Sequence, residues 1–195
     1  MQIREKIKLF LRWFTLTIRS GPLIGKKWIA ASGGRFIRGT YETVNTEAFQ
    51  RCVDLGDIVY DVGGHVGYFS VLSSHLTGPK GRVLVFEPRP LNAAYIKHHI
   101  KINSINNISL FEVAVSSISG EARFDSRTGT GTGHLSVKGN LNVKTIILDE
   151  FVYGESHPPP DFIKIDIEGG EIDALNGAQE ILASARPILL IATHG

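Results

Sequence analysis

The sequence predicts an α/β fold in which a doubly wound, mostly parallel sheet carries helices on both faces. Short apolar runs alternate with amphipathic stretches from residue 57 onward, and the first run leads directly into a glycine turn. Strands joined by helices in this way run parallel and cross over right-handedly. At 195 residues the chain is long enough for one domain with a full core.

The expected elements follow in order along the chain. Strands are expected over 57–62, 82–88, 108–115, 161–168 and 187–193, and helices over 67–76, 90–104 and 171–183. Asn92 is a candidate cap of the second of these helices. The region 117–160 interrupts the rhythm, with short strands expected over 120–126 and 143–151. The Thr- and Gly-rich segment between them, 127–135, is either a lid over a substrate or a surface loop.

Composition excludes several classes of protein. The chain has 21 Lys and Arg residues against 19 Asp and Glu, a formal net charge of +2, so it lacks the overall basic field of nucleic-acid binders. Cys52 is the single cysteine, which excludes an internal disulfide and a cysteine-rich zinc site. We therefore expect a cytoplasmic protein with neither a nucleic-acid partner nor a bound metal; the sequence does not indicate an oligomeric state.

The first twenty residues combine apolar and basic side chains at helical spacing. The apolar positions are Ile3, Ile7, Phe10, Phe14 and Ile18, and the basic ones are Arg4, Lys8, Arg12 and Arg19. We expect an amphipathic helix within a lead-in over residues 1–40, followed by the main domain at 41–195. Because Arg12 interrupts the apolar run, the segment is short for a membrane span and wrong for a secretory signal. The alternatives are packing on the domain, peripheral contact of residues 1–20 with a membrane, or a cleaved or flexible leader.

A glycine turn, DVGGHVGYF at 61–69, follows the first strand of the expected sheet. A P-loop needs Lys and Ser or Thr after its last glycine, and a dinucleotide fingerprint needs glycines at 63, 65 and 68. His65 and Tyr68 occupy two of those positions, so neither pattern fits. What remains is Asp61-x-Gly63-x-x-x-Gly67. Bare backbone at the glycines and helix N–H groups suit a carboxylate, and Asp61 suits an amino group.

Glu87 ends the next strand, 20 residues after Gly67. An acidic side chain at this place can accept hydrogen bonds from both hydroxyls of a ribose. An amino acid joined to a ribose without a pyrophosphate describes S-adenosyl-L-methionine, which is the predicted cofactor. The alternative of an NAD-dependent oxidoreductase is disfavoured because the second and third fingerprint glycines are missing.

From about residue 40 to residue 195 the chain resembles the FkbM family of S-adenosylmethionine-dependent methyltransferases. The resemblance rests on YE at 41–42, GDIVYDVGGHVGYFS, GRVLVFEP, FEVAVSSISGEARF, TIILDEF, DFIKIDIEGGE and RPILLIATHG. It implies a class I, Rossmann-like methyltransferase fold and O-methylation of a hydroxyl on a sugar or secondary metabolite, with a small molecule or glycan as the acceptor. By motif match it also implies that Asp61, Gly63, His65, Gly67, Glu87, Ala114 and Val115 line the cofactor site. We further predict that Glu42, Tyr68 and Asp166 contact the cofactor.

The chain departs from the family pattern in three respects. Gly64 and His65 stand where members commonly have Ala and Asn, and Ala192 stands where many have Glu. The fold normally closes with two strands after the fifth, and Gly195 ends this chain, so we expect a sheet without them. Ala192, the missing final strands and the basic N-terminal helix support an alternative function as a non-catalytic cofactor-binding or membrane-associated module.

Transfer of a methyl group to a hydroxyl requires positioning of the acceptor and removal of its proton. Asp166 and Glu168, at the carboxyl end of the fourth expected strand, are the candidate catalytic residues. Lys164 precedes Asp166 by two residues, and we expect the two side chains to pair, which would keep the carboxylate ionised. His134 and His194 are alternative bases. Asp166, Glu168 and His194 could together ligate a metal ion, but we expect no metal site.

Overall fold

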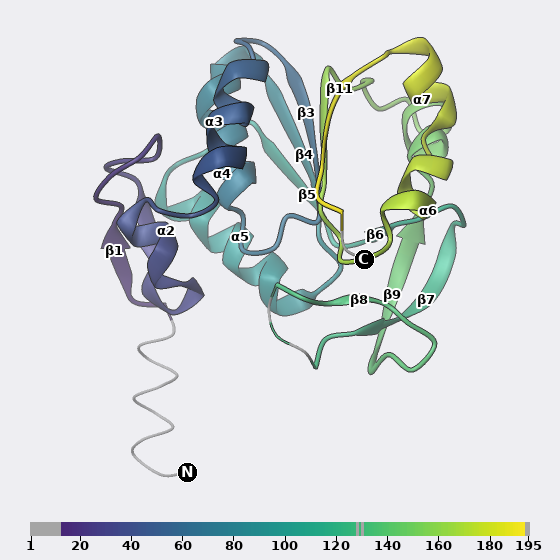
Figure 1. The fold of residues 1–195 in the computed structure, drawn as a ribbon, viewed down its shortest axis with the longest axis horizontal. Helices are drawn as coiled ribbons and strands as arrows, with labels where there is room; N and C mark the ends of the chain where they lie inside the picture. The colour runs from purple at the N-terminus through teal and green to yellow at the C-terminus, as the bar shows by residue number, and fades with distance from the viewer. Residues whose placement is uncertain (1–12, 128, 130, 194–195) are drawn as a thin grey trace.

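The computed structural model describes residues 13–127, 129 and 131–193, and its centre is a parallel sheet of five strands (Figure 1). The strand order is β11 (Ile188–Ile191), β10 (Phe162–Ile165), β3 (Ile58–Val62), β4 (Arg82–Phe86) and β5 (Ile108–Phe111). Every neighbouring pair in this sheet is parallel. The predicted doubly wound α/β fold is therefore confirmed. The winding reverses at β3, since β4 follows it on one side and β10 joins it on the other.

Helices cover both faces of the central sheet. One side carries α3 (Thr43–Cys52), α4 (Tyr68–Thr77) and α5 (Pro90–Ile102), and the other carries α6 (Glu171–Asn176) and α7 (Gln179–Ser184) (Figure 1). Successive side chains of β3 point to opposite faces. Val59 accordingly belongs to the apolar cluster on one face and Tyr60 to the cluster on the other. A strand buried on both faces explains the nearly continuous apolar run in its sequence.

A second, smaller sheet occupies most of the region 117–160, where the alternation of strands and helices is interrupted. Its order is β6 (Ala114–Val115), β9 (Leu141–Ile146), β7 (Gly120–Asp125) and β8 (His134–Leu135). The single strand expected over 108–115 is therefore wrong, because the chain leaves the central sheet after β5 and joins the smaller one at β6. β8 lies inside the segment expected to be irregular, where it pairs with the end of β7.

Two further boundaries differ from the expectation because of specific contacts. The helix expected over 171–183 is broken at Gly177, where a Cβ atom would lie 2.4 Å from the Ser116 carbonyl oxygen. The strand expected over 143–151 ends with β9. After it, the Asp149 carboxylate accepts hydrogen bonds from the backbone N–H groups of Glu180 and Ile181 at the start of α7, at 2.8 and 2.9 Å.

Asn92 is not a helix cap. α5 begins at Pro90, a residue suited to a first helical position, and Arg89 precedes it without a capping side-chain bond. Asn92 lies inside the first turn, 3% exposed, and faces the site described below.

The lead-in is not helical where the structure describes its first part. β1 (Thr15–Thr17) and β2 (Lys27–Ile29) form an antiparallel hairpin, followed by the short helix α2 (Gly34–Arg38). The helix expected over residues 1–20 is wrong from residue 13 onward, and residues 1–12 lie outside the described part. Trp28, fully buried, packs in the same cluster as the domain's own core, so this segment packs on the domain. The division at residue 40 stays a prediction. Within the described residues no helix is both long and apolar enough to cross a membrane.

His99 of α5 joins the hairpin to the glycine turn. Its Nε2 accepts a hydrogen bond from the Ile29 N–H at 3.1 Å, so its Nδ1 carries the proton and donates to the Val66 carbonyl at 2.8 Å. The ring is fully buried and stacks on Trp28 with centroids 3.7 Å apart. Burial lowers the pKa of His99 to about 4, so the imidazole is neutral at physiological pH.

We expect His99→Phe to lower the free energy of unfolding by about 2–4 kcal/mol, because it leaves the Ile29 N–H and the Val66 carbonyl buried without partners. His75→Phe, at an exposed position of α4, is the control and should change it by less than about 0.5 kcal/mol. The wild type should also lose stability as the pH falls from about 6.5 towards 4, since the unfolded chain then protonates an imidazole that the fold keeps neutral. Urea unfolding at several pH values measures both effects. An unchanged pH dependence in His99→Phe would contradict this assignment.

Candidate functional site

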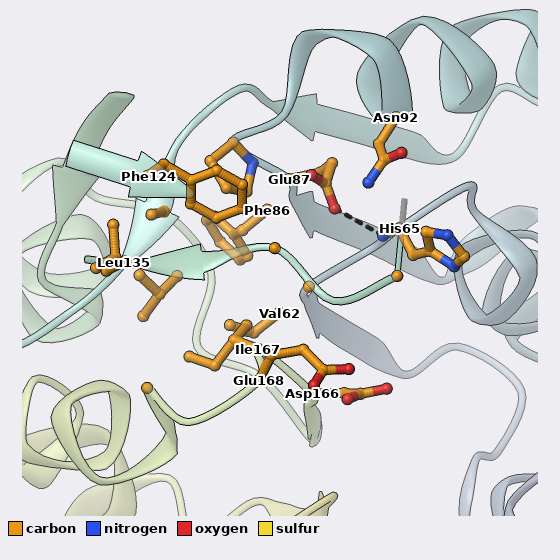
Figure 2. Close-up of a pocket in the computed structure, with 17 residues that line it drawn as sticks. Val62, His65, Phe86, Glu87, Asn92, Phe124, Leu135, Asp166, Ile167 and Glu168 are labelled. Carbon is orange, nitrogen blue, oxygen red and sulfur yellow. Dashed lines mark hydrogen bonds between the residues drawn. The ribbon is translucent and has the colours of Figure 1, made fainter. Parts of the chain in front are cut away.

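Two hollows lie side by side at the carboxyl ends of β3, β4 and β10, where the winding of the sheet reverses and where α/β sheets bind ligands. We call them the apolar hollow and the polar hollow. They share a wall made of Gly63, His65, Gly131, Asp166 and Glu168. The apolar hollow, drawn in Figure 2, is further lined by Val62, Phe86, Glu87, Asn92, Ala114, Val115, Phe124, Leu135 and Ile167, among others. The polar hollow is further lined by Tyr41, Glu42, Asn45, Gly64, Tyr68, Phe69, Lys164 and Ala192.

The glycine turn brings β3 and β10 close together. Gly63 has φ +81° and Gly67 has φ +93°, the left-handed region in which side chains are strained. A Cβ atom on Gly63 would lie 2.0 Å from the Asp166 carbonyl oxygen, and one on Gly67 would lie 3.1 Å from Cγ1 of Ile96. The turn therefore needs a glycine at 63 both for its dihedral angle and for the room it leaves.

Glu87 faces the apolar hollow from the end of β4 with only 4% of its surface exposed. Its carboxylate accepts a hydrogen bond from the His65 backbone N–H at 2.8 Å (Figure 2) and one from the Arg89 N–H at 2.9 Å. Burial raises the pKa of Glu87 to about 7 in spite of these bonds. A carboxylate held in this way still has lone pairs for hydroxyl donors of a ligand in the hollow.

His65 stands on the wall between the two hollows with φ +50°, a rare angle for a residue other than glycine. Burial and, to a smaller extent, the positive charge of Lys164 lower the pKa of His65 to about 4, so the ring is neutral. Its Nε2 is buried and has no hydrogen-bond partner among the described residues. This nitrogen is available to a ligand.

Lys164 is a buried cation, 5% exposed, in the floor of the polar hollow. Its Nζ donates to the Gly63 carbonyl oxygen at 3.2 Å and lies 3.4 Å from the Asp61 carboxylate and 3.6 Å from the Asp166 carboxylate. The expected pairing with Asp166 is present. Burial alone would lower the pKa of Lys164, but the two carboxylates outweigh it and hold that pKa above its usual value.

Asp61 lies behind the turn rather than on the surface of either hollow. It is fully buried, accepts a hydrogen bond from the Ser70 hydroxyl at 2.6 Å and faces Lys164. Burial raises the pKa of Asp61, and Lys164 and Ser70 oppose that rise. In this arrangement Asp61 holds Lys164 in place, and its direct contact with a cofactor stays a prediction.

The structure gathers most of the predicted site residues in one place. The predicted residues that line a hollow are Glu42, Gly63, His65, Tyr68, Glu87, Ala114, Val115, Asp166 and Glu168. Gly67 shapes the turn without lining either hollow. His134 lies on β8, where its Nδ1 is 3.4 Å from the Thr132 carbonyl, and it lines neither hollow. His194 lies outside the described residues.

The smaller sheet supplies a wall that the sequence analysis did not predict. Phe124 of β7 and Leu135 of β8 are paired in register and line the apolar hollow (Figure 2). The segment between them also reaches the site: Gly131 lines both hollows, and the Arg89 guanidinium donates to the Gly129 carbonyl. The segment 127–135 therefore contributes to the site wall, and its opening as a lid stays a prediction.

Residues 61–195 match the sequence profile of the family described as the methyltransferase FkbM domain. Among curated proteins, the chain is 28% identical to the hexuronic acid methyltransferase AglP of Haloferax volcanii, covering 69% of this chain and 55% of that protein. It is also 28% identical to the 2-O-methyltransferase NoeI of Sinorhizobium fredii, covering 55% of this chain and 52% of that protein. The chain thus spans about half the length of the curated relatives it matches.

Solved structures show the same fold at low sequence identity. The methyltransferase FkbM of Methylobacillus flagellatus KT superimposes on 70% of this chain and 32% of its own with a TM-score of 0.52 and 20% identity. The precorrin-6y C5,15-methyltransferase of Geobacter metallireducens GS-15 covers 82% of this chain and 64% of its own with a TM-score of 0.50 and 18% identity. These likenesses establish the class I methyltransferase fold.

Proposed function

The chain belongs to the FkbM methyltransferase domain family, and on that premise we propose that it transfers a methyl group from S-adenosylmethionine to a hydroxyl group of a sugar or glycan. The relatives support this acceptor class, since one is named for hexuronic acids and the other for 2-O-methylation. The observation that carries the proposal is the buried carboxylate of Glu87 beside the glycine turn, at the sheet edge where the winding reverses.

The two hollows fit the two ends of this cofactor. Apolar side chains such as Phe86 and Val115 suit a flat adenine base, and Glu87 suits the hydroxyls of a ribose beside it. In the polar hollow, Glu42 and Asp166 suit an ammonium group, while His65 Nε2 and the backbone N–H groups at the uncapped start of α4 suit a carboxylate. When bound, S-adenosylmethionine supplies an electrophilic methyl group on sulfur.

Asp166 and Glu168 are the proposed catalytic residues because both line the wall common to the two hollows. A carboxylate there can accept the proton of an acceptor hydroxyl and hold its oxygen for in-line attack. The Lys164 ammonium lies 3.6 Å from the Asp166 carboxylate and forms an ion pair with it. Lys164 is thus proposed to position Asp166 and not to touch the acceptor.

Calorimetric titration with S-adenosylhomocysteine tests cofactor binding. Glu87→Ala removes the acceptor of two hydrogen bonds to a charged group, so we expect about a 100-fold loss of affinity, and Glu87→Gln should lose about tenfold. The matched control is Glu112→Ala, an exposed glutamate directly after β5. If Glu87→Ala bound S-adenosylhomocysteine with the affinity of the wild type, Glu87 would not be the ribose-binding residue. Thermal unfolding of each variant separates loss of binding from loss of fold.

Transfer of a labelled methyl group to a panel of glycosides with neutral and uronic-acid rings tests the reaction itself. Asp166→Asn should lower kcat by about 100-fold or more, the usual contribution of a positioned base. Cofactor binding without turnover on any acceptor would support the alternative of a non-catalytic module. Failure of both measurements would refute the proposed function.

A further inference from the structure

The charge of the chain is divided unevenly between its two parts. Residues 1–40 hold nine basic residues and one acidic residue, whereas residues 41–195 hold twelve basic and eighteen acidic residues. The formal net charge of +2 conceals this division. Within the described lead-in, residues 13–40, every charged side chain is basic, namely Arg19, Lys26, Lys27, Arg35 and Arg38. We call residues 13–40 the basic lobe.

The basic lobe also exposes large apolar side chains. Phe14 is 52% exposed, Leu16 37% and Ile24 65%. Phe14 directly precedes β1, and its carbonyl oxygen accepts a hydrogen bond from the Ala30 N–H at 2.8 Å, so the extended pairing of the hairpin includes it. Leu16, two residues further on, therefore points to the same side of the hairpin. Single exposed apolar residues are ordinary on a protein surface. Here three exposed large apolar side chains fall within eleven residues, on a segment whose charges are all positive. This combination indicates a surface that binds both anionic groups and apolar groups.

The lobe is fixed rigidly to the domain, which a docking surface requires if it is to orient the protein. The Lys27 backbone exchanges two hydrogen bonds with the Asn103 side chain, at 2.8 and 2.9 Å, and the Ile29 N–H binds His99. These bonds use the backbone of Lys27 and leave its side chain exposed. No ion pair links the five basic side chains to any other residue in the described part of the chain.

We propose that the basic lobe docks on the surface of an anionic lipid bilayer, with the lysine and arginine side chains at the headgroups and Phe14, Leu16 and Ile24 inserted among them. The lobe lies at one end of the molecule, on the side opposite α7, and is therefore free to meet a flat surface (Figure 1). A bilayer matches both features of the lobe. A nucleic acid would match only the charge of the lobe.

Co-sedimentation of the full chain with vesicles tests the proposal without depending on methyl transfer. We expect binding to vesicles with 30% anionic lipid, little binding to purely zwitterionic ones, and release at high salt. Neutralising Lys26, Lys27 and Arg38 to Gln should weaken partitioning by about 100-fold, since each basic residue near an anionic surface contributes about fivefold. Phe14→Ser with Ile24→Ser should weaken it by about tenfold or more.

The matched control neutralises three exposed lysines of the body, Lys80, Lys101 and Lys144, and should change partitioning by less than about twofold. Circular dichroism verifies that each variant is folded. Vesicle binding that is lost equally in the control, or kept in the lobe variants, would overturn the assignment to this surface. Binding to a DNA or RNA duplex or self-association, without vesicle binding, would overturn it as well. If the wild-type chain did not bind S-adenosylhomocysteine, the proposed function would be refuted, but the vesicle-binding result would still stand.

Discussion

Lys164→Met is expected to lower the free energy of unfolding by about 3–5 kcal/mol, the usual effect of removing one partner from a buried ion pair. The change leaves the fully buried Asp61 without its counter-charge, and Ser70 alone then supports that carboxylate. In the variant, the folded state raises the pKa of Asp61 above its unfolded value. It therefore binds a proton that the unfolded chain does not, and the destabilisation should be smaller at pH 5 than at pH 7. Urea unfolding at the two pH values measures this.

The control for this variant is Lys144→Met, which replaces an exposed lysine on β9 and should change stability by less than about 0.5 kcal/mol. Adding Asp61→Asn to Lys164→Met removes the uncompensated charge and should restore at least about half of the loss. A double variant no more stable than the single one would show that Lys164 acts through packing and not through its charge.

Gly63→Ala is expected to remove measurable binding of S-adenosylhomocysteine, with a loss of about 100-fold or more, and to destabilise the fold by about 3–5 kcal/mol. The new methyl group would lie 2.0 Å from the Asp166 carbonyl oxygen, where ordinary contact begins at 3.4 Å. β3 and β10 must then move apart at the wall shared by both hollows. A misplacement near 1 Å costs about 100-fold in rate where reacting groups must be positioned, and we expect a loss of cofactor affinity of the same order. Left-handed strain adds about 1–2 kcal/mol.

Gly56→Ala separates the effect of backbone strain from the effect of the steric clash. Gly56 also has a positive φ, +95°, but a Cβ atom there would meet nothing within 4 Å. We expect the strain alone, about 1–2 kcal/mol, and unchanged affinity for S-adenosylhomocysteine. Equal effects of the two substitutions, measured by calorimetry and thermal unfolding, would contradict the close approach of the two strands.

The sequence could predict the parts of the site that depend on local rules. Strand ends next to a turn fix where Gly63, Glu87 and Asp166 lie, because parallel strands present their carboxyl ends at the same edge of the sheet. The pairing of Lys164 with Asp166 follows from their spacing, since residues i and i+2 of a strand point to the same face. Each of these features requires only one strand and the turn that follows it.

Other features depend on contacts between distant segments and had no local signal. The wall made by Phe124 and Leu135 exists because β7 and β8 pair across a loop. The lead-in shows the same limit: Phe14, Leu16 and Ile18 also alternate, so their pattern fits a strand as well as a helix. Pairing with β2 decides between the two.

The smaller sheet has a consequence for how members of this fold can diverge. One wall of the apolar hollow is lined by residues at the strand ends of the parallel sheet. A change of register in those strands would displace the whole core. The opposite wall comes from the β7–β8 hairpin, whose connecting loop tolerates substitution and insertion at little thermodynamic cost. Substitutions in the hairpin wall can thus change which ligand the apolar hollow accepts, while the wall made by the parallel strands, which the fold requires, stays constant.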